Sequence, residues 1–136
     1  MDDFRQMINY DELTSDDTIT LARAAAEAIR GLNWATRCDA GLDQPAVACD
    51  VIGALSLAAS RLGQLLRQIT SYLDRSLAAG RLGHDHGTDP APDVNGAGIF
   101  LDDARLSAAA LAGDLSQAQE LLAAINASPR TRKDQP

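Results

Sequence analysis

Apolar residues recur at intervals of three and four along two long segments of the chain, residues 48–73 and 101–125. This spacing places one apolar row on one side of an α-helix, the side that packs against other helices in a coiled-coil-like bundle. We therefore predict an all-α fold, an elongated antiparallel bundle of three long helices. The first row comprises Ala48, Val51, Leu55, Ala58, Leu62, Leu65, Ile69 and Tyr72, and the second comprises Leu101, Ala104, Ala108, Leu111, Leu115, Ala118, Leu122 and Ile125.

Start and stop signals set the expected helix bounds. Thr14 and the following Ser-Asp-Asp supply an N-cap hydroxyl and carboxylates for the positive end of a helix, so the first helix is expected at about 15–37. Its end is expected at Gly41, because glycine readily adopts the left-handed conformation that closes helices. Proline is tolerated in the first turn, so Pro45 predicts a second helix at about 46–79.

The remaining segments complete a single bundle domain over residues 15–128. The third helix is expected at about 99–127, after a Gly- and Pro-rich loop at 80–98 that we predict to be flexible. Residues 1–14 form an acidic N-terminal segment in which Phe4, Met7 and Ile8 share helical spacing and predict a short helical turn. The tail at 129–136 is predicted to be disordered.

Charge and composition limit the classes of partner. The 136 residues carry a formal net charge of -7, which disfavours nucleic-acid binding without excluding it, because duplex affinity depends on neutralising phosphates. No uninterrupted apolar run reaches the roughly 18–20 residues of a membrane span, and the acidic start is unlike a signal peptide. We therefore expect a cytoplasmic protein that makes no membrane contact.

The first half of the second helix is apolar on more than one side. Between Ala46 and Ser60 the only charged residue is Asp50. A helix segment that is apolar all round must be covered all round, so we expect a homodimer here; the alternative is that the N-terminal segment covers it. The predicted oligomer interface comprises Val47, Val51, Ile52, Leu55 and Leu57.

Four arginines, Arg61, Arg67, Arg75 and Arg81, are expected to form a basic row along the outside of the second helix. Guanidinium groups pair well with carboxylates and phosphates, so one interpretation is a docking surface for an anionic partner, with protein favoured over nucleic acid. The other is an ordinary solvated helix face, in which Asp74, Asp102 and Asp114 are available as partners.

Arg81 and His86 form an R-x4-H arrangement that resembles the signature of HEPN-type ribonucleases, which are small helical bundles that often dimerise. The resemblance implies that Arg81 would hold the scissile phosphate while His86 acts as a general acid or base. Leu82 stands where that family usually has a polar residue, and the motif falls in the Gly-rich loop. A HEPN-like nuclease, or a nucleic-acid-associated regulator, is thus the alternative function.

The sequence predicts no metal and no cofactor. His84 and His86, with Asp85 and Asp89, carry metal-ligating groups, but these are adjacent in one loop and lack a distant further ligand. Two other residue types have ordinary structural interpretations. Cys38 and Cys49 are expected to be small buried hydrophobic residues, and Trp34 to close one end of the core, with an interface anchor as its alternative.

The stretch PAVACDVIGALSLAASRLGQLLRQITSYLDRSLAAGRL, with the Asp/Gly/His loop and Ala-rich helix that follow it, resembles small uncharacterised all-helical proteins of actinobacteria, often carried by mobile elements. That resemblance implies a helical fold and brings no activity with it. From the residues, the favoured function is a non-catalytic interaction or adaptor protein that self-associates and docks a protein partner. An acidic mimic of nucleic acid is a third hypothesis, suggested by the net charge alone.

Overall fold

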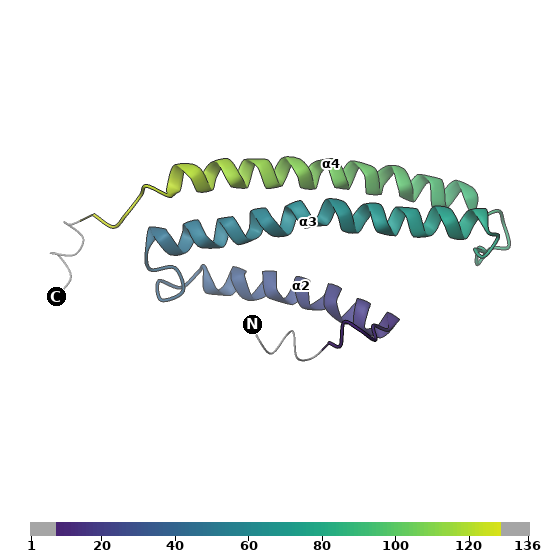
Figure 1. The fold of residues 1–136 in the computed structure, drawn as a ribbon, viewed down its shortest axis with the longest axis horizontal. Coiled ribbons are helices and arrows are strands. Elements are labelled where there is room, and N and C mark those ends of the chain that lie inside the picture. Colours follow the sequence, from purple (N-terminus) through teal and green to yellow (C-terminus); the bar gives the residue numbers. More distant parts are fainter. Residues whose placement is uncertain (1–7, 129–136) are drawn as a thin grey trace. The chain divides into compact units, whose positions relative to one another are not determined.

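The computed structural model describes residues 8–128, and within that range the chain contains three α-helices and no strand (Figure 1). The helices are α2 at Ser15–Ala35, α3 at Pro45–Ala78 and α4 at Ala91–Leu122. The predicted all-α fold with three long helices is confirmed. The chain divides into two compact units, Met1–Asp43 and Gln44–Pro136. The predicted turn at Phe4 and Met7 and the tail at 129–136 lie outside the described residues.

The first unit contains α2, which begins where the sequence predicted. Thr14 is the N-cap: its Oγ1 accepts a hydrogen bond from the Asp17 backbone N–H, and the Asp17 carboxylate accepts one from the Thr14 backbone N–H. The predicted role of Gly41 is wrong, because the glycines with positive φ among the described residues are Gly80 and Gly87. At position 41 a Cβ atom would instead collide with the carbonyl oxygen of Ala35, so close backbone approach requires the glycine.

The second unit begins with α3, whose bounds differ by one residue at each end from those expected. Pro45 occupies the first turn as predicted. Gly80 closes the end of the helix: its φ of 70° turns the chain so that the Arg81 backbone N–H donates a hydrogen bond to the Ser76 carbonyl oxygen over 3.0 Å. This is a Schellman closure, in which glycine takes the left-handed position just beyond the helix.

The predicted start of the third helix near 99 is wrong, because α4 begins at Ala91 and includes much of the segment expected to be a flexible loop. Two prolines mark its true start, with Pro90 at the N-cap and Pro92 in the first turn. Gly98 lies beside Thr70 of α3, since a Cβ atom at position 98 would be 4.0 Å from Cγ2 of Thr70. Packing on α3 offsets the low helix propensity of glycine in this part of α4. The helix also ends earlier than expected, at Leu122.

α3 and α4 pack side by side as an antiparallel pair (Figure 1). Their contacts recur every seven residues on both helices, joining Cys49 to Gln119, Ser56 to Ala112, Gly63 to Arg105 and Thr70 to Gly98. Most of these side chains are small, so the two backbones approach closely. Ala59 on α3 and Ala108 on α4 are correspondingly buried in this contact.

Candidate interaction surface

The apolar row predicted on the second helix does not form the contact with α4. The contact positions on α3, such as Ser56 and Gly63, each follow a residue of that row by one position, which is about 100° of rotation around the helix. The row's larger side chains consequently lie outside the contact between α3 and α4, so this row does not pack against α4. Their exposed fractions are 40% for Leu62, 49% for Leu65, 40% for Ile69 and 56% for Tyr72.

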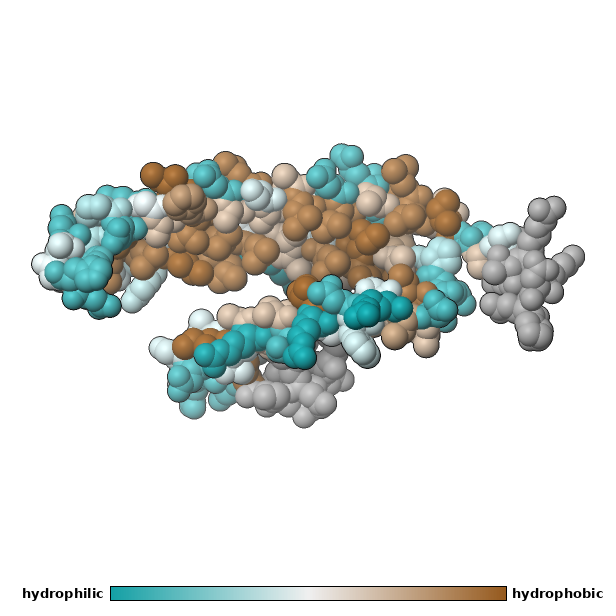
Figure 2. All heavy atoms as spheres, turned by 180° about the vertical axis from the view of Figure 1, so that it is seen from behind, coloured by the Kyte–Doolittle hydropathy of each residue, from teal (hydrophilic) through white to brown (hydrophobic). Residues whose placement is uncertain are grey.

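The same side of α4 carries further exposed apolar side chains. Leu111 comes directly before the contact residue Ala112, and Leu62 comes directly before the contact residue Gly63. In an antiparallel helix pair, the positions directly before the contact residues of the two helices lie on the same side of the pair. Figure 2 shows this side, where apolar residues cover α3 and α4 together. We define the apolar face by its large members, which are Leu55, Leu62, Leu65, Ile69 and Tyr72 of α3 and Phe100, Leu111 and Leu121 of α4.

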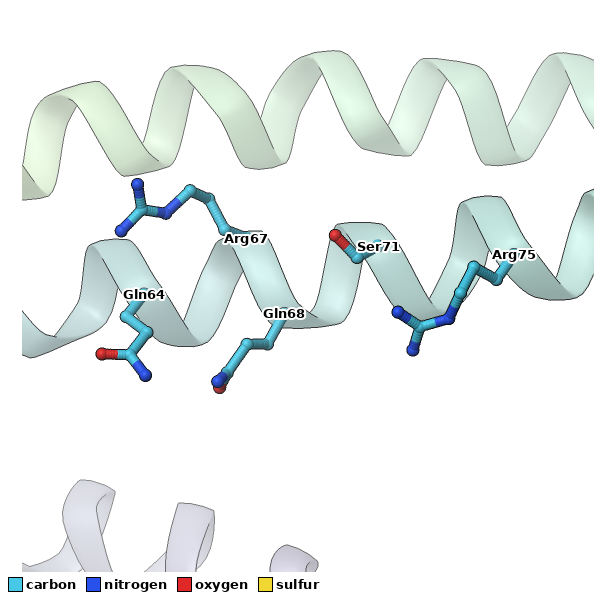
Figure 3. A pocket seen from close by; sticks show the side chains of 5 residues that line it. All are labelled: Gln64, Arg67, Gln68, Ser71 and Arg75. Atoms are coloured by element: carbon cyan, nitrogen blue, oxygen red, sulfur yellow. The ribbon is translucent and has the colours of Figure 1, made fainter.

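The opposite side of the same pair is polar. A shallow hollow of about 370 Å³ lies along α3 between Gln64, Arg67, Gln68, Ser71 and Arg75 (Figure 3). Arg67 extends toward α4, whereas Gln64 and Gln68 extend away from it. On α4, Arg105 donates two hydrogen bonds to Oδ1 of Asp102, the shorter over 2.7 Å. The two sides of the pair therefore differ sharply in chemistry.

The predicted arginine row is partly realised. Arg61, Arg67 and Arg75 are exposed on α3, but Arg81 follows the end of that helix and does not extend the row along it. Within residues 8–128 none of these four guanidinium groups forms an ion pair, and the expected partner Asp102 pairs with Arg105 instead. The arginines on α3 thus remain available to an outside ligand.

The five residues predicted as an oligomer interface do not lie on one side of α3. Val51 and Leu55 fall on the side of the apolar face, whereas Ile52 falls at a contact position toward α4. Leu57 is 51% exposed and lies nearer the polar side. The longer apolar face was not predicted, because the same row was expected to pack against other helices.

Arg81 and His86, the residues of the R-x4-H arrangement, lie in the segment that connects the end of α3 to the start of α4, and both are exposed. The histidine of this segment whose side chain forms hydrogen bonds is His84: its Nε2 lies 2.7 Å from Oδ2 of Asp93, and its Nδ1 accepts a hydrogen bond from the His86 backbone N–H. Because Nδ1 is an acceptor, the proton of the neutral ring is on Nε2. Both nitrogens of His84 are thus engaged in fixing the loop onto the first turn of α4.

Two other expectations are wrong. Trp34 is 69% exposed, with the Arg37 guanidinium carbon 5.6 Å from its ring centre, so it does not close a core. Cys38 is exposed, while Cys49 is half-buried and its thiol lies 3.7 Å from the carbonyl oxygen of Gln119. In the part of the chain that the structure describes, no three histidine, cysteine, aspartate or glutamate residues lie close enough to hold a metal ion.

Among the described residues one helix, α3, is long and apolar enough to cross a membrane by length and composition alone. Such a helix is weak evidence for a membrane segment, since core and interface helices share this composition. The absence of membrane contact remains a prediction.

Comparison with protein-family models, with curated proteins and with solved structures finds no match for this chain. Its candidate sites are therefore inferred from the positions and exposure of the residues described above.

Proposed function

We propose that this chain is a non-catalytic interaction protein whose α3–α4 pair binds another protein through the apolar face. The observation that supports this most strongly is the alignment of Leu62, Leu65, Ile69 and Tyr72, all between 40% and 56% exposed, along one side of α3. Scattered exposed leucines are ordinary on soluble proteins, whereas a continuous apolar surface usually marks a contact site.

The arginines add charge selectivity to this surface. Arg61 precedes Leu65 by four residues and Arg75 follows Tyr72 by three, and residues at those spacings are neighbours on a helix surface. An apolar surface bordered by unpaired guanidinium groups fits a partner that combines apolar side chains with carboxylates. In this proposal the protein works in the cytoplasm as an adaptor, without metal or cofactor.

The proposal is tested by comparing Leu65→Glu with Leu106→Glu. Both replace a leucine on the helix pair, 49% exposed at position 65 and 55% at position 106, but Leu106 lies toward the polar side. The tagged wild-type chain is used to capture and identify a binding protein from its host, and purified samples then give affinities. We expect Leu65→Glu to weaken binding at least tenfold and Leu106→Glu to leave it within twofold. Equal affinities for the two variants would contradict the proposal.

A further inference from the structure

We propose that the apolar face is occupied by the same face of a second copy of this chain, so that two α3–α4 pairs form a four-helix bundle. This inference rests on the proposed function, because it concerns the same surface, which a second copy and a host protein can occupy only in turn.

The size of the apolar face matches what a dimer needs. Seven of its large side chains are between 40% and 78% exposed, which leaves on the order of 800 Å² of surface on each copy. The largest apolar patch of a typical monomer is roughly 300–600 Å². A standard stable interface buries about 800 Å² per partner, so covering this face with its counterpart gives an interface of ordinary size.

The face can pair with itself because its α3 part carries no charged residue. The row from Val51 to Tyr72 is wholly apolar, so a two-fold axis brings no like charges together within it. An antiparallel copy centred on Leu62 places Leu55 opposite the partner's Ile69, and Ala58 level with the partner's Leu66 and beside the partner's Leu65. Apolar side chains then meet along the row, and the small Ala58 leaves room for a larger leucine.

Arg61, which lies beside the row, distinguishes a second copy of this chain from a partner that carries carboxylates. Arg61 lies next to Leu62, so the proposed axis brings it toward the partner's Arg61. A second copy therefore gains nothing from this guanidinium group, and Arg61→Ala should leave self-association unchanged or tighten it. A partner with carboxylates at this position would bind less tightly to the same variant.

Sedimentation equilibrium at micromolar concentrations tests the inference. We expect the wild-type chain, and its Leu106→Glu variant, to sediment at about twice 14.4 kDa, and Leu65→Glu to sediment as a monomer with unchanged helix content. A monomeric wild-type chain would overturn the inference, as would a Leu65→Glu dimer. If the wild-type chain is monomeric but its captured host protein is lost with Leu65→Glu, the proposed function stands and only the second copy is rejected.

Cysteine cross-linking tests the geometry without relying on a disruptive variant. In a chain carrying Cys38→Ser and Cys49→Ser, Leu62→Cys should form a disulfide-linked dimer under mild oxidation, whereas Leu106→Cys should not. Equal cross-linking at the two positions would overturn the proposed axis. Flotation of a monomeric wild-type chain with phosphatidylcholine/phosphatidylserine vesicles, lost in Leu65→Glu, would overturn the second copy in favour of a lipid surface.

Discussion

Ser56 on α3 donates a hydrogen bond from its Oγ to the backbone carbonyl oxygen of Ala112 on α4, over 2.8 Å. A side chain as short as serine reaches a neighbouring helix backbone only where the two helices lie very close. The contact therefore marks a close approach of the two helices, and it fixes how α3 is rotated relative to α4. That rotation in turn leaves the larger apolar side chains of α3 outside the contact.

Replacing Ser56 tests this closeness. Ser56→Ala removes one half-buried hydrogen bond and should lower the free energy of unfolding by about 1 kcal/mol. Ser56→Leu should lower it by about 3 kcal/mol, because the larger side chain forces the helices apart. Urea unfolding followed by circular dichroism measures both changes. Ser60→Ala is the matched control, since Ser60 Oγ bonds within α3 to the Leu57 carbonyl oxygen over 2.7 Å; an equal loss there would contradict the proposed closeness.

Two helical glycines should respond differently to alanine. Nothing lies within 4 Å of a Cβ atom at Gly113, so Gly113→Ala should stabilise the chain by about 0.5–1 kcal/mol through helix propensity. A Cβ atom at Gly53 would overlap the side-chain amide of Gln119, so Gly53→Ala should gain less. The double variant Gly53→Ala/Gln119→Ala should recover the difference, as thermal unfolding can show. Equal gains from the two single variants would mean that Gln119 moves aside without cost.

The sequence predicted the helices better than their orientation. Thr14 and Pro45 mark helix starts through chemistry local to them, and both predictions are confirmed. The start of α4 was missed because Gly96 and Gly98 are poor helix formers, so Pro90 and Pro92, which mark the true start, were assigned to a loop. The α3 contact was missed because its residues are small and partly polar, so hydrophobicity pointed to the larger row beside it. A signal was nevertheless present: Cys49, Ser56, Gly63 and Thr70 place a small side chain every seven residues.

The loop before α4 gives a local prediction. His84→Ala removes the 2.7 Å contact with Asp93 and should speed hydrogen exchange of the α4 backbone amides at 94–97 several-fold. The effect on global stability should stay small, because the Asp93 side chain is 75% exposed and water screens the pair. His86→Ala is the control, since His86 contributes a backbone N–H that alanine retains. Equal exchange in the two variants would show that the His84 side chain does not hold the loop.

The nuclease alternative makes a prediction of its own. We expect the purified wild-type chain to leave labelled single-stranded RNA intact, because Arg81 and His86 are exposed on a loop, whereas catalytic stabilisation of a developing charge depends on groups held in a site that excludes water. Denaturing gels with and without divalent metal measure cleavage. Cleavage that persists through purification and disappears in both Arg81→Ala and His86→Ala would establish the HEPN-like alternative and contradict a non-catalytic function.

The arginines on α3 should matter for a carboxylate-bearing partner more than for fold or self-association. Arg61, Arg67 and Arg75 are exposed and form no ion pair among residues 8–128, so changing all three to alanine should leave helix content and unfolding unchanged. Exposed charge pairs contribute about 0.2–1 kcal/mol each, so affinity for the captured host protein should fall roughly 3- to 150-fold and its salt dependence should weaken. Changing Arg23, Arg30 and Arg37 to alanine is the control, because it alters net charge equally outside α3. If both triple variants weaken binding alike, overall charge and not the arginine row is responsible; if neither does, the row has no part in recognition.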